Sequence, residues 1–415
     1  MRVRPFGVSL AVLLLAAACG GGGPGIGGGT PASNIPDTIK VAAALPLSGA
    51  DATPGGFFDK AYKLYVKQVN DAGGLNIAGK KVKIDLRTED NKSDAATSGQ
   101  LYEKFVTQDN VDFLLGGYNT TSVTQEVKVA NRLGMVYVGA GGASSSIYVD
   151  NKWAFGVLAS IQKLSATQLA FMKDAQDAGK LPKPTKIAVA YENSSHGKEF
   201  LQGIQDGAKA APDRFQVVFD SAFDLSGKDY TSLLNKVRDV KADAYMVDAR
   251  VGDMITMQTQ YAQLGMYHRY LTYGPRGPEQ QARDQLKSQS DYIIAATWWD
   301  SLMPGDTIKK FNETWTAAKL TPSASWFEAG AWEAARILFT GIEKSGGVDK
   351  QKVHDTIMNT TWDSSIFPGG AIKFGTTGQA DNDYVMTQNT PDGKHILIWP
   401  KALATGTATV PIPPK

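Results

Sequence analysis

The sequence predicts an α/β protein made of two doubly wound lobes, each a parallel sheet covered by helices. Short apolar, β-rich runs alternate with amphipathic segments from residue 39 onward. After residue 140 the alternation breaks and then restarts, which indicates two sheets rather than one. The 415 residues, 42% of them hydrophobic, suffice for two globular lobes.

The first half begins with a strand at 39–45, IKVAAAL. The helix predicted at 56–72 has its apolar residues on one side and ends at Gly73-Gly74. Further strands are predicted at 81–86, 111–117 and 135–140, with helices at 93–108 and 120–133.

The second half repeats this order. Strands are predicted at 186–191, 215–220, 243–248, 269–273 and 292–299, with helices at 163–179, 197–210, 229–239 and 252–264. Helices at 306–319 and 325–345 and short strands at 371–374, 384–389 and 394–398 complete the chain. Ligands of open parallel sheets bind beyond the carboxyl ends of the strands, so the loops there are where we expect function.

The N-terminus has the layout of an export signal. Arg2 and Arg4 precede an apolar run at 10–18, which ends in three alanines directly before Cys19. That run is shorter than the roughly 20 residues that span a bilayer. Residues 1–18 therefore resemble a bacterial lipoprotein signal, with lipid attachment at Cys19. The alternative is a plain secretory signal with an accidental cysteine. The glycine-rich stretch at 19–37 is expected to be a flexible tether.

Composition and motifs argue against several classes of protein. Removing the two signal arginines from the 43 Lys and Arg residues leaves 41, which equals the number of Asp and Glu residues. This balanced charge argues against a nucleic-acid partner. A single cysteine allows no disulfide framework and no cysteine metal cluster. Residues 74–81 nearly match a phosphate loop, but Lys81 replaces the required Ser or Thr. The four histidines show no metal-ligand spacing, and no nucleophile elbow occurs. We expect no catalytic residues, no metal and no cofactor.

Several segments, in order along the chain, resemble one known family: the type I periplasmic binding proteins of the branched-chain or hydrophobic amino acid and amide class. The segments are IKVAAALPLSG (39–49), NDAGGLNIAGKKVKI (70–84), TEDNKSDAATS (88–98), VDFLLGGYNTTSVT (111–124), GMVYVGAGGASS (134–145), KIAVAYENSSHGKEF (186–200), FPGGAIKFGTTGQ (367–379) and a stretch at 385–400. The resemblance implies ligand capture by hinge closure and delivery to an ABC permease and ATPase complex.

The resemblance also implies three chain crossings between the lobes, near Leu158, Thr297 and Gly370. The expected boundaries are 38–158 plus 299–370 for lobe 1, 159–298 plus 371–403 for lobe 2, and a flexible tail at 404–415. The protein is expected to be a monomer that acts outside the cytoplasm, in the periplasm or at the cell surface, anchored to the membrane through Cys19.

Ligand contacts in lobe 1 are carried over by matching positions. The loop after 111–117 matches the family's carboxylate-holding turn and places three residues at the ligand: Tyr118, Asn119 and Thr120. Thr120 also begins a helix, so a plain helix cap is a compatible interpretation. Gly141 and Ala143 match positions that contact the ligand's main-chain groups, and Ser48 is a further candidate in the first loop.

Lobe 2 departs more from the family. His196 falls where an aromatic residue commonly closes over the ligand, although a solvent-exposed helix start is equally compatible. Arg250 falls at another aromatic position, and Arg276 falls where amino-acid binders commonly carry an acidic group. Two arginines favour an organic, aromatic or dicarboxylic anion over an amino acid. The alternative is that Arg276 pairs with a carboxylate such as Glu279 and points away. Trp298 is a candidate for stacking on a flat ligand or for structural packing.

Two other functions compete with import. A ligand-sensing receptor that signals through a membrane partner can use the same fold. An extracytoplasmic hydrolase is a third class, which the lack of a catalytic triad in the sequence disfavours.

Overall fold

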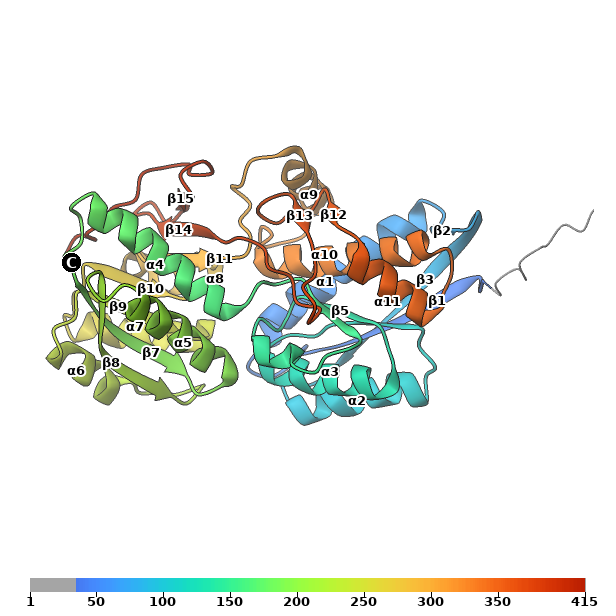
Figure 1. The fold of residues 1–415 in the computed structure, drawn as a ribbon, viewed down its shortest axis with the longest axis horizontal. Helices are drawn as coiled ribbons and strands as arrows, with labels where there is room; N and C mark the ends of the chain where they lie inside the picture. The colour runs from blue at the N-terminus through green and yellow to red at the C-terminus, as the bar shows by residue number, and fades with distance from the viewer. Residues whose placement is uncertain (1–34, 415) are drawn as a thin grey trace, which may run out of the picture. The chain divides into compact units, whose positions relative to one another are not determined.

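The computed structural model describes residues 35–414 and contains two α/β lobes (Figure 1). The predictions of a signal peptide, of lipid attachment at Cys19 and of most of the tether concern residues that lie outside the described part of the chain. The two doubly wound lobes predicted from the sequence are present.

The sheet of lobe 1 has parallel strands, with one antiparallel strand at an edge. Its order is β2 (Leu75–Ile77), β3 (Lys80–Asp90), β1 (Thr38–Leu45), β4 (Phe113–Leu115), β5 (Tyr137–Gly139) and β6 (Ala154–Gly156). The central strand β1 pairs with β3 from Thr38–Lys83 to Leu45–Asp90. Residues 41–45 of β1 are fully buried, because helices cover both faces of the sheet.

Helices pack on the two faces of this sheet as pairs. One face carries α2 (Ala95–Thr107) and α3 (Thr120–Leu133), and the other carries α1 (Ala52–Asp71) and α10 (Trp326–Ser345). The short helix η1 (Ser145–Tyr148) follows β5, and α11 (Lys350–Asn359) packs against α10. Lobe 1 also includes α9 (Asp306–Ala317) and the two-stranded pair β12 (Trp362–Asp363) and β13 (Ala371–Ile372).

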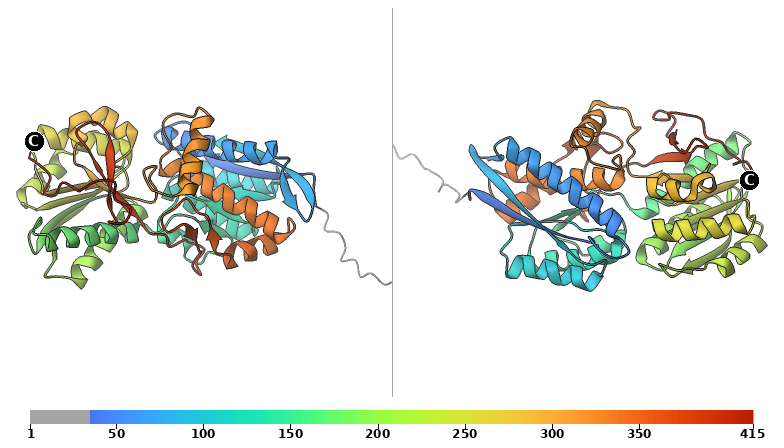
Figure 2. Two further views of the ribbon diagram at one scale, coloured as in Figure 1. Left: turned by 90° about the horizontal axis from the view of Figure 1, so that it is seen from above. Right: turned by 180° about the vertical axis from the view of Figure 1, so that it is seen from behind.

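The sheet of lobe 2 contains five parallel strands, and at one edge two further strands are added by antiparallel pairing. Its order is β15 (His395–Trp399), β14 (Val385–Asn389), β11 (Ile294–Thr297), β10 (Tyr270–Tyr273), β9 (Ala244–Asp248), β7 (Thr185–Glu192) and β8 (Phe215–Phe223). The antiparallel pairs are β14 with β11 and β15 with β14. The helices of this lobe are α4 (Ile161–Asp177), α5 (Ser195–Ala210), α6 (Thr231–Asp239), α7 (Val251–Gln263), α8 (Gln280–Leu286) and η2 (Lys287–Ser290). Figure 2 shows helices on both faces of this sheet as well.

The chain passes between the lobes three times, and the third passage differs from the expectation. The first passage follows β6 and the second follows β11, close to Leu158 and Thr297. The third was expected near Gly370. Instead β13 pairs with β12, and Gln379 forms a bridge with Gly156, so residues 371–380 remain with lobe 1. The chain joins the second sheet only at β14.

Residues 404–414, expected to be a flexible tail, pack against lobe 2. The side chains of Val410 and Ile412 are each only 6% exposed. The backbone N–H of Ile412 donates to the carbonyl of Arg269, and the Thr409 backbone bonds to the side chain of Gln388. The two apolar side chains and these hydrogen bonds together hold the end of the chain on lobe 2.

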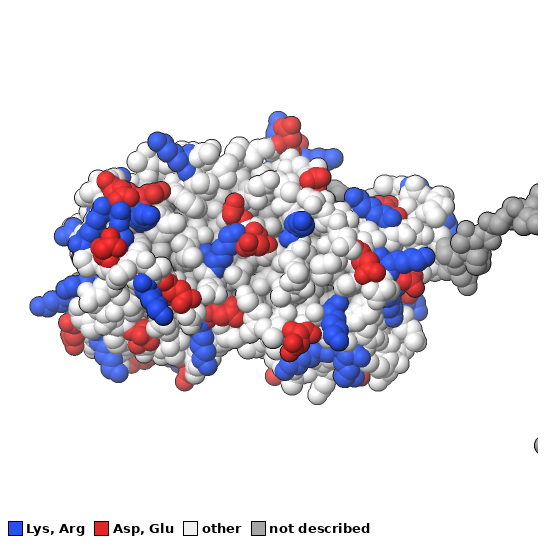
Figure 3. Space-filling view, in the orientation of Figure 1, with Lys and Arg blue, Asp and Glu red and all other residues white. Residues whose placement is uncertain are grey.

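The sequence did not reveal several short elements, among them β2, β6, α8 and α11. The stretch at 74–81 forms a hairpin in which β2 pairs with β3. None of the described helices is long and apolar enough to cross a membrane. Figure 3 shows Lys and Arg side chains interspersed with Asp and Glu over this face of the protein.

Candidate ligand-binding site

The carboxyl ends of strands from both sheets point toward one region between the lobes. A small cavity there, which we call the central pocket, has a volume of about 20 Å³, room for about one water molecule. Its walls are Tyr118, Asn119, Thr120, Thr121, Gly141, Ala143, Leu158, Glu192, His196, Arg250, Arg276, Trp298 and Trp326. Nine of the ten residues predicted from the sequence to contact the ligand therefore come together, from both lobes.

The turn after β4 brings a helix start to the pocket. Asn119, with φ of 69°, caps α3 by accepting a hydrogen bond from the Ser122 backbone N–H at 2.9 Å. The cap is therefore Asn119 rather than Thr120, which is the first residue of the helix. The Asn119 amide also donates to Asp51 at 2.9 Å. The positive end of α3 thus faces the pocket, as an anion would require.

The buried side chain of Glu126 fixes the turn after β4 through hydrogen bonds. Glu126 accepts hydrogen bonds from the Gly117 backbone N–H at 2.9 Å, the Ser98 hydroxyl at 2.7 Å and the Tyr137 hydroxyl at 2.8 Å. Burial raises the pKa of Glu126 to about 7, even though these bonds act in the opposite direction.

The loop after β5 reaches the pocket because it contains glycine. A Cβ on Gly141 would lie 1.8 Å from the carbonyl oxygen of Gly117, so only glycine allows the two loops to touch. The carbonyl of Ala143 accepts a bond from the Gln379 side chain at 3.1 Å. Ser48, in contrast, does not line the central pocket. Its hydroxyl donates to Asp90 at 2.6 Å, which holds it in a loop of lobe 1 outside the pocket.

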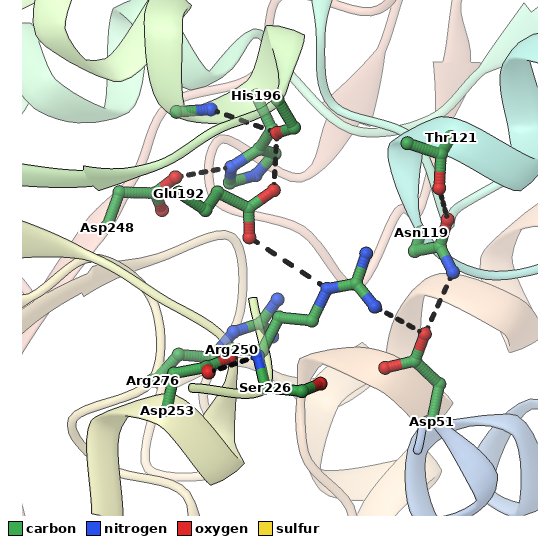
Figure 4. Close-up of polar contacts among 12 residues, drawn as sticks. Asp51, Asn119, Thr121, Glu192, His196, Ser226, Asp248, Arg250, Asp253 and Arg276 are labelled. Carbon is green, nitrogen blue, oxygen red and sulfur yellow. Dashed lines mark hydrogen bonds and ion pairs between the residues drawn. The ribbon is translucent and has the colours of Figure 1, made fainter. Parts of the chain in front are cut away.

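Lobe 2 contributes a buried imidazole with a carboxylate on each side. His196 lies in the first turn of α5, and its Nδ1 is 2.7 Å from Oδ2 of Asp248 at the end of β9 (Figure 4). Burial alone would lower the pKa of His196, but the Asp248 carboxylate outweighs this effect and the pKa is raised. Burial raises the pKa of Glu192, and Asp248 adds to that rise. The solvent-exposed helix start considered for His196 is therefore wrong.

Arg250 joins the two lobes across the pocket. Its Nη1 donates to Oδ2 of Asp51, in lobe 1, at 2.7 Å, and its Nε lies 3.9 Å from Oε2 of Glu192 (Figure 4). Asp51 therefore receives bonds from both Asn119 and Arg250.

Arg276 is buried, with 6% of its surface exposed. Its Nη1 donates to Glu279 at 3.0 Å and its Nη2 to the Tyr118 hydroxyl, in lobe 1, at 3.1 Å. The guanidinium carbon lies 5.2 Å and 5.4 Å from the ring centres of Trp326 and Phe327. The pairing with Glu279 considered from the sequence is correct, but Arg276 faces the pocket rather than away from it. Among the described residues, nothing accepts a hydrogen bond from its buried Nε.

Trp298 serves both the pocket and the chain crossings. Its indole N–H donates to the carbonyl of Ala159 at 3.0 Å, and its ring lies 5.6 Å from that of Tyr384. The Tyr384 hydroxyl donates toward the carbonyls of Ala159 and Ser160. Trp298 thus packs where the three crossings meet, as the structural alternative proposed, and also borders the pocket.

One group of side chains has the composition of a metal site. One ligand atom from each of Glu192, His196 and Asp248 lies within 4.8 Å of the others. However, His196 already bonds to Asp248, and the Arg250 guanidinium next to Glu192 opposes a second cation. The arrangement is better suited to polar contacts with a ligand than to metal binding.

Four residues of the pocket were not predicted as ligand contacts, namely Thr121, Leu158, Glu192 and Trp326, and two of them are charged or aromatic. Glu192 is the last residue of β7, so the rule that function lies at strand ends could have found it. Trp326 begins α10, far along the chain from the other pocket residues, and no local pattern marked it.

The lobes also meet beside the pocket. Glu199, in α5, accepts hydrogen bonds from the backbone N–H groups of Ser145 at 2.7 Å and Ser146 at 3.0 Å. It also accepts a bond from the Ser144 hydroxyl. One carboxylate of lobe 2 therefore receives three bonds from a single loop of lobe 1.

Two α/β lobes, three chain crossings and a polar pocket where strand ends of both lobes meet define the architecture of this protein. The family model described as "Periplasmic binding protein" matches residues 38–394. The chain belongs to this family, and its fold is that of the type I, leucine-binding-protein-like members.

Curated relatives and solved structures agree with this assignment. The chain is 23% identical to "Leu/Ile/Val-binding protein homolog 8" of Brucella abortus (strain 2308), over 88% of this chain and 91% of the relative. The leucine-binding protein LivK of Thermotoga maritima has a TM-score of 0.76 at 15% identity and covers 87% of this chain and 97% of its own. A solute-binding protein of an ABC transporter from R. palustris, in complex with benzoate, has a TM-score of 0.74 at 20% identity and covers 90% and 98%.

Proposed function

We propose that this protein is the extracytoplasmic substrate-binding lipoprotein of an ABC importer and captures a small carboxylated solute by closing its two lobes. The main support is Arg276, whose buried Nε lacks an acceptor among the described residues and which borders the central pocket. A ligand carboxylate would supply that acceptor, and the start of α3 would stabilise its charge from the opposite lobe.

Lipid attachment at Cys19 would keep the protein near its permease, and fatty-acid labelling that is lost in Cys19→Ser tests this anchor.

Within this class we propose an organic or aromatic anion rather than an amino acid. An amino acid brings an ammonium group that needs a free carboxylate. Asp51 and Glu279 each already bond to an arginine of the protein, and Asp248 bonds to His196. Glu192, the carboxylate that lines the pocket, lies 3.9 Å from Nε of Arg250. Little negative charge is left for a ligand ammonium.

Calorimetry with leucine, benzoate and 4-hydroxybenzoate tests the ligand class. We expect at least one of the two benzoates to bind about tenfold or more tightly than leucine, because leucine would also bury an ammonium group without a free carboxylate. Arg276→Lys keeps the charge but loses the planar fork, so it should weaken benzoate binding about tenfold. Arg269→Lys, at an exposed arginine, is the matched control. Tight leucine binding that Arg276→Lys leaves unchanged would contradict the anionic ligand.

Hinge closure predicts a specific effect at Glu199. Its three bonds to residues 144–146 exist only when the lobes meet, so Glu199→Ala should shift the unliganded protein toward open forms by about tenfold or more. Single-molecule fluorescence between dyes on the two lobes would measure this shift. Lys198→Ala, at the neighbouring exposed residue of α5, should leave the distribution unchanged. The same distribution in Glu199→Ala as in the wild type would show that these bonds do not stabilise closure.

A further inference from the structure

A second and much larger cavity lies beside the central pocket. It has a volume of about 500 Å³ and is walled by four aromatic side chains, Phe57, Trp299, Trp326 and Phe327, which we call the aromatic chamber. Its lining includes residues of α8 in lobe 2 and of the first turns of α1 and α10 in lobe 1. Its size falls in the range of sites that hold drug-sized molecules.

The chamber adjoins the arginine of the central pocket. Trp326 borders both cavities, and Glu279, the partner of Arg276, lines the chamber. A ligand that lies along the Trp326 ring would therefore extend from one cavity into the other. The central pocket, at about 20 Å³, cannot contain a whole aromatic acid in this arrangement of the lobes.

Most charged groups of the chamber have partners in the protein, whereas Asp284 is exposed to solvent. His395 and Asp300 are 2.7 Å apart, Arg283 donates to two backbone carbonyls, and Glu279 bonds to Arg276. The chamber thus offers aromatic faces and neutral polar groups, and its wall carries three carboxylates, Glu279, Asp284 and Asp300, against one arginine, Arg283, which disfavours a second ligand carboxylate. Burying a charge there would be costly, whereas an uncharged ring would gain from apolar burial.

We propose that the ligand is an extended aromatic monocarboxylate, with its carboxylate at Arg276 and the start of α3 and its uncharged aromatic end in the aromatic chamber. This inference rests on the proposed function and narrows the ligand class. The proposed ligand has more than one ring and has no second carboxylate at its distal end.

Three probes that differ by one ring or one carboxylate test the proposal by calorimetry: benzoate, biphenyl-4-carboxylate and biphenyl-4,4′-dicarboxylate. A second ring buries on the order of 100 Å² of apolar surface, so we expect biphenyl-4-carboxylate to bind at least about tenfold more tightly than benzoate. The dicarboxylate should lose at least about tenfold relative to the biphenyl monocarboxylate.

A variant that fills the chamber tests its contribution to binding separately from that of the central pocket. Ala324 is buried in the chamber wall, and Ala324→Trp should reduce biphenyl-4-carboxylate affinity at least about tenfold while benzoate affinity stays within about twofold. Ser323→Trp, at an exposed residue of the same wall, is the second variant if Ala324→Trp does not fold. Ala317→Trp, on the exposed part of α9, is the control.

The possible failures are distinguishable. Equal binding of benzoate and biphenyl-4-carboxylate, or an equal loss of both in the filled variant, would overturn the chamber assignment and leave the proposed function standing. Binding of none of the three carboxylates would overturn the proposed ligand class and this inference with it.

Discussion

Replacing Arg276 with alanine is expected to lower the free energy of unfolding by about 3–5 kcal/mol. The pair that it forms with Glu279 is buried, and the two side chains are 7% and 9% exposed. Removing the guanidinium leaves a carboxylate without its cation in a site where burial already raises the pKa of Glu279. Urea denaturation at neutral pH would measure the loss.

The double variant Arg276→Met/Glu279→Leu distinguishes a broken pair from a lost contact. It replaces both charges with apolar groups, so its stability should lie within about 2 kcal/mol of the wild type. Arg269→Ala removes a half-exposed arginine and should cost less than about 1 kcal/mol. If Arg276→Ala proves as stable as Arg269→Ala, the pair is solvated rather than buried.

Replacing Glu126 with alanine is expected to cost about 3–6 kcal/mol, because three donors lose their acceptor together. These are the Gly117 N–H, the Ser98 hydroxyl and the Tyr137 hydroxyl, all of them buried. The Gly117 bond also holds the turn that leads to Asn119 and α3. Ligand affinity should therefore fall together with stability, which calorimetry and urea denaturation would show.

The same residue predicts a dependence of stability on pH. Burial raises the pKa of Glu126 from 4.5 to about 7, so the folded protein holds a proton that the unfolded chain releases. Stability from this group is fully present below pH 4.5 and declines by about 3 kcal/mol as the pH rises to about 7. Glu328, whose pKa burial also raises to about 7, adds a decline of the same sign.

Comparing the wild type with Glu126→Ala isolates the contribution of Glu126. The stability difference between the two proteins should be larger at pH 5 than at pH 7.5. A difference that stays constant over this range would show that Glu126 does not hold a proton in the folded protein.

Most of the fold could be predicted because each long element carries its own periodic signal. The helix at Thr120–Leu133 was predicted at its observed bounds, and β1 within one residue. Short elements such as β6 and α8 were missed, because three to seven residues show too little periodicity. The third crossing was placed too early, because the pairing of β12 with β13 depends on residues that tertiary contacts bring together.

The candidate site, like the fold, could be predicted from the sequence only in part. The rule that ligands bind at strand ends, together with the family resemblance, was enough to name nine residues that meet in one pocket. It left open whether Arg276 faces the ligand or pairs with the nearby Glu279, and it could not show that Arg276 stacks on Trp326 and reaches Tyr118 of the other lobe. The burial of this charge depends on aromatic side chains from distant parts of the chain.

The sequence by itself thus determined the α/β class, the two lobes and the edges at which they meet, because these follow from local hydrophobic periodicity and strand order. Only the tertiary structure decided which charges are satisfied, where the tail docks and that an aromatic chamber lies beside the arginines. Those features depend on contacts between segments that are far apart in the chain, and no local pattern encodes that geometry.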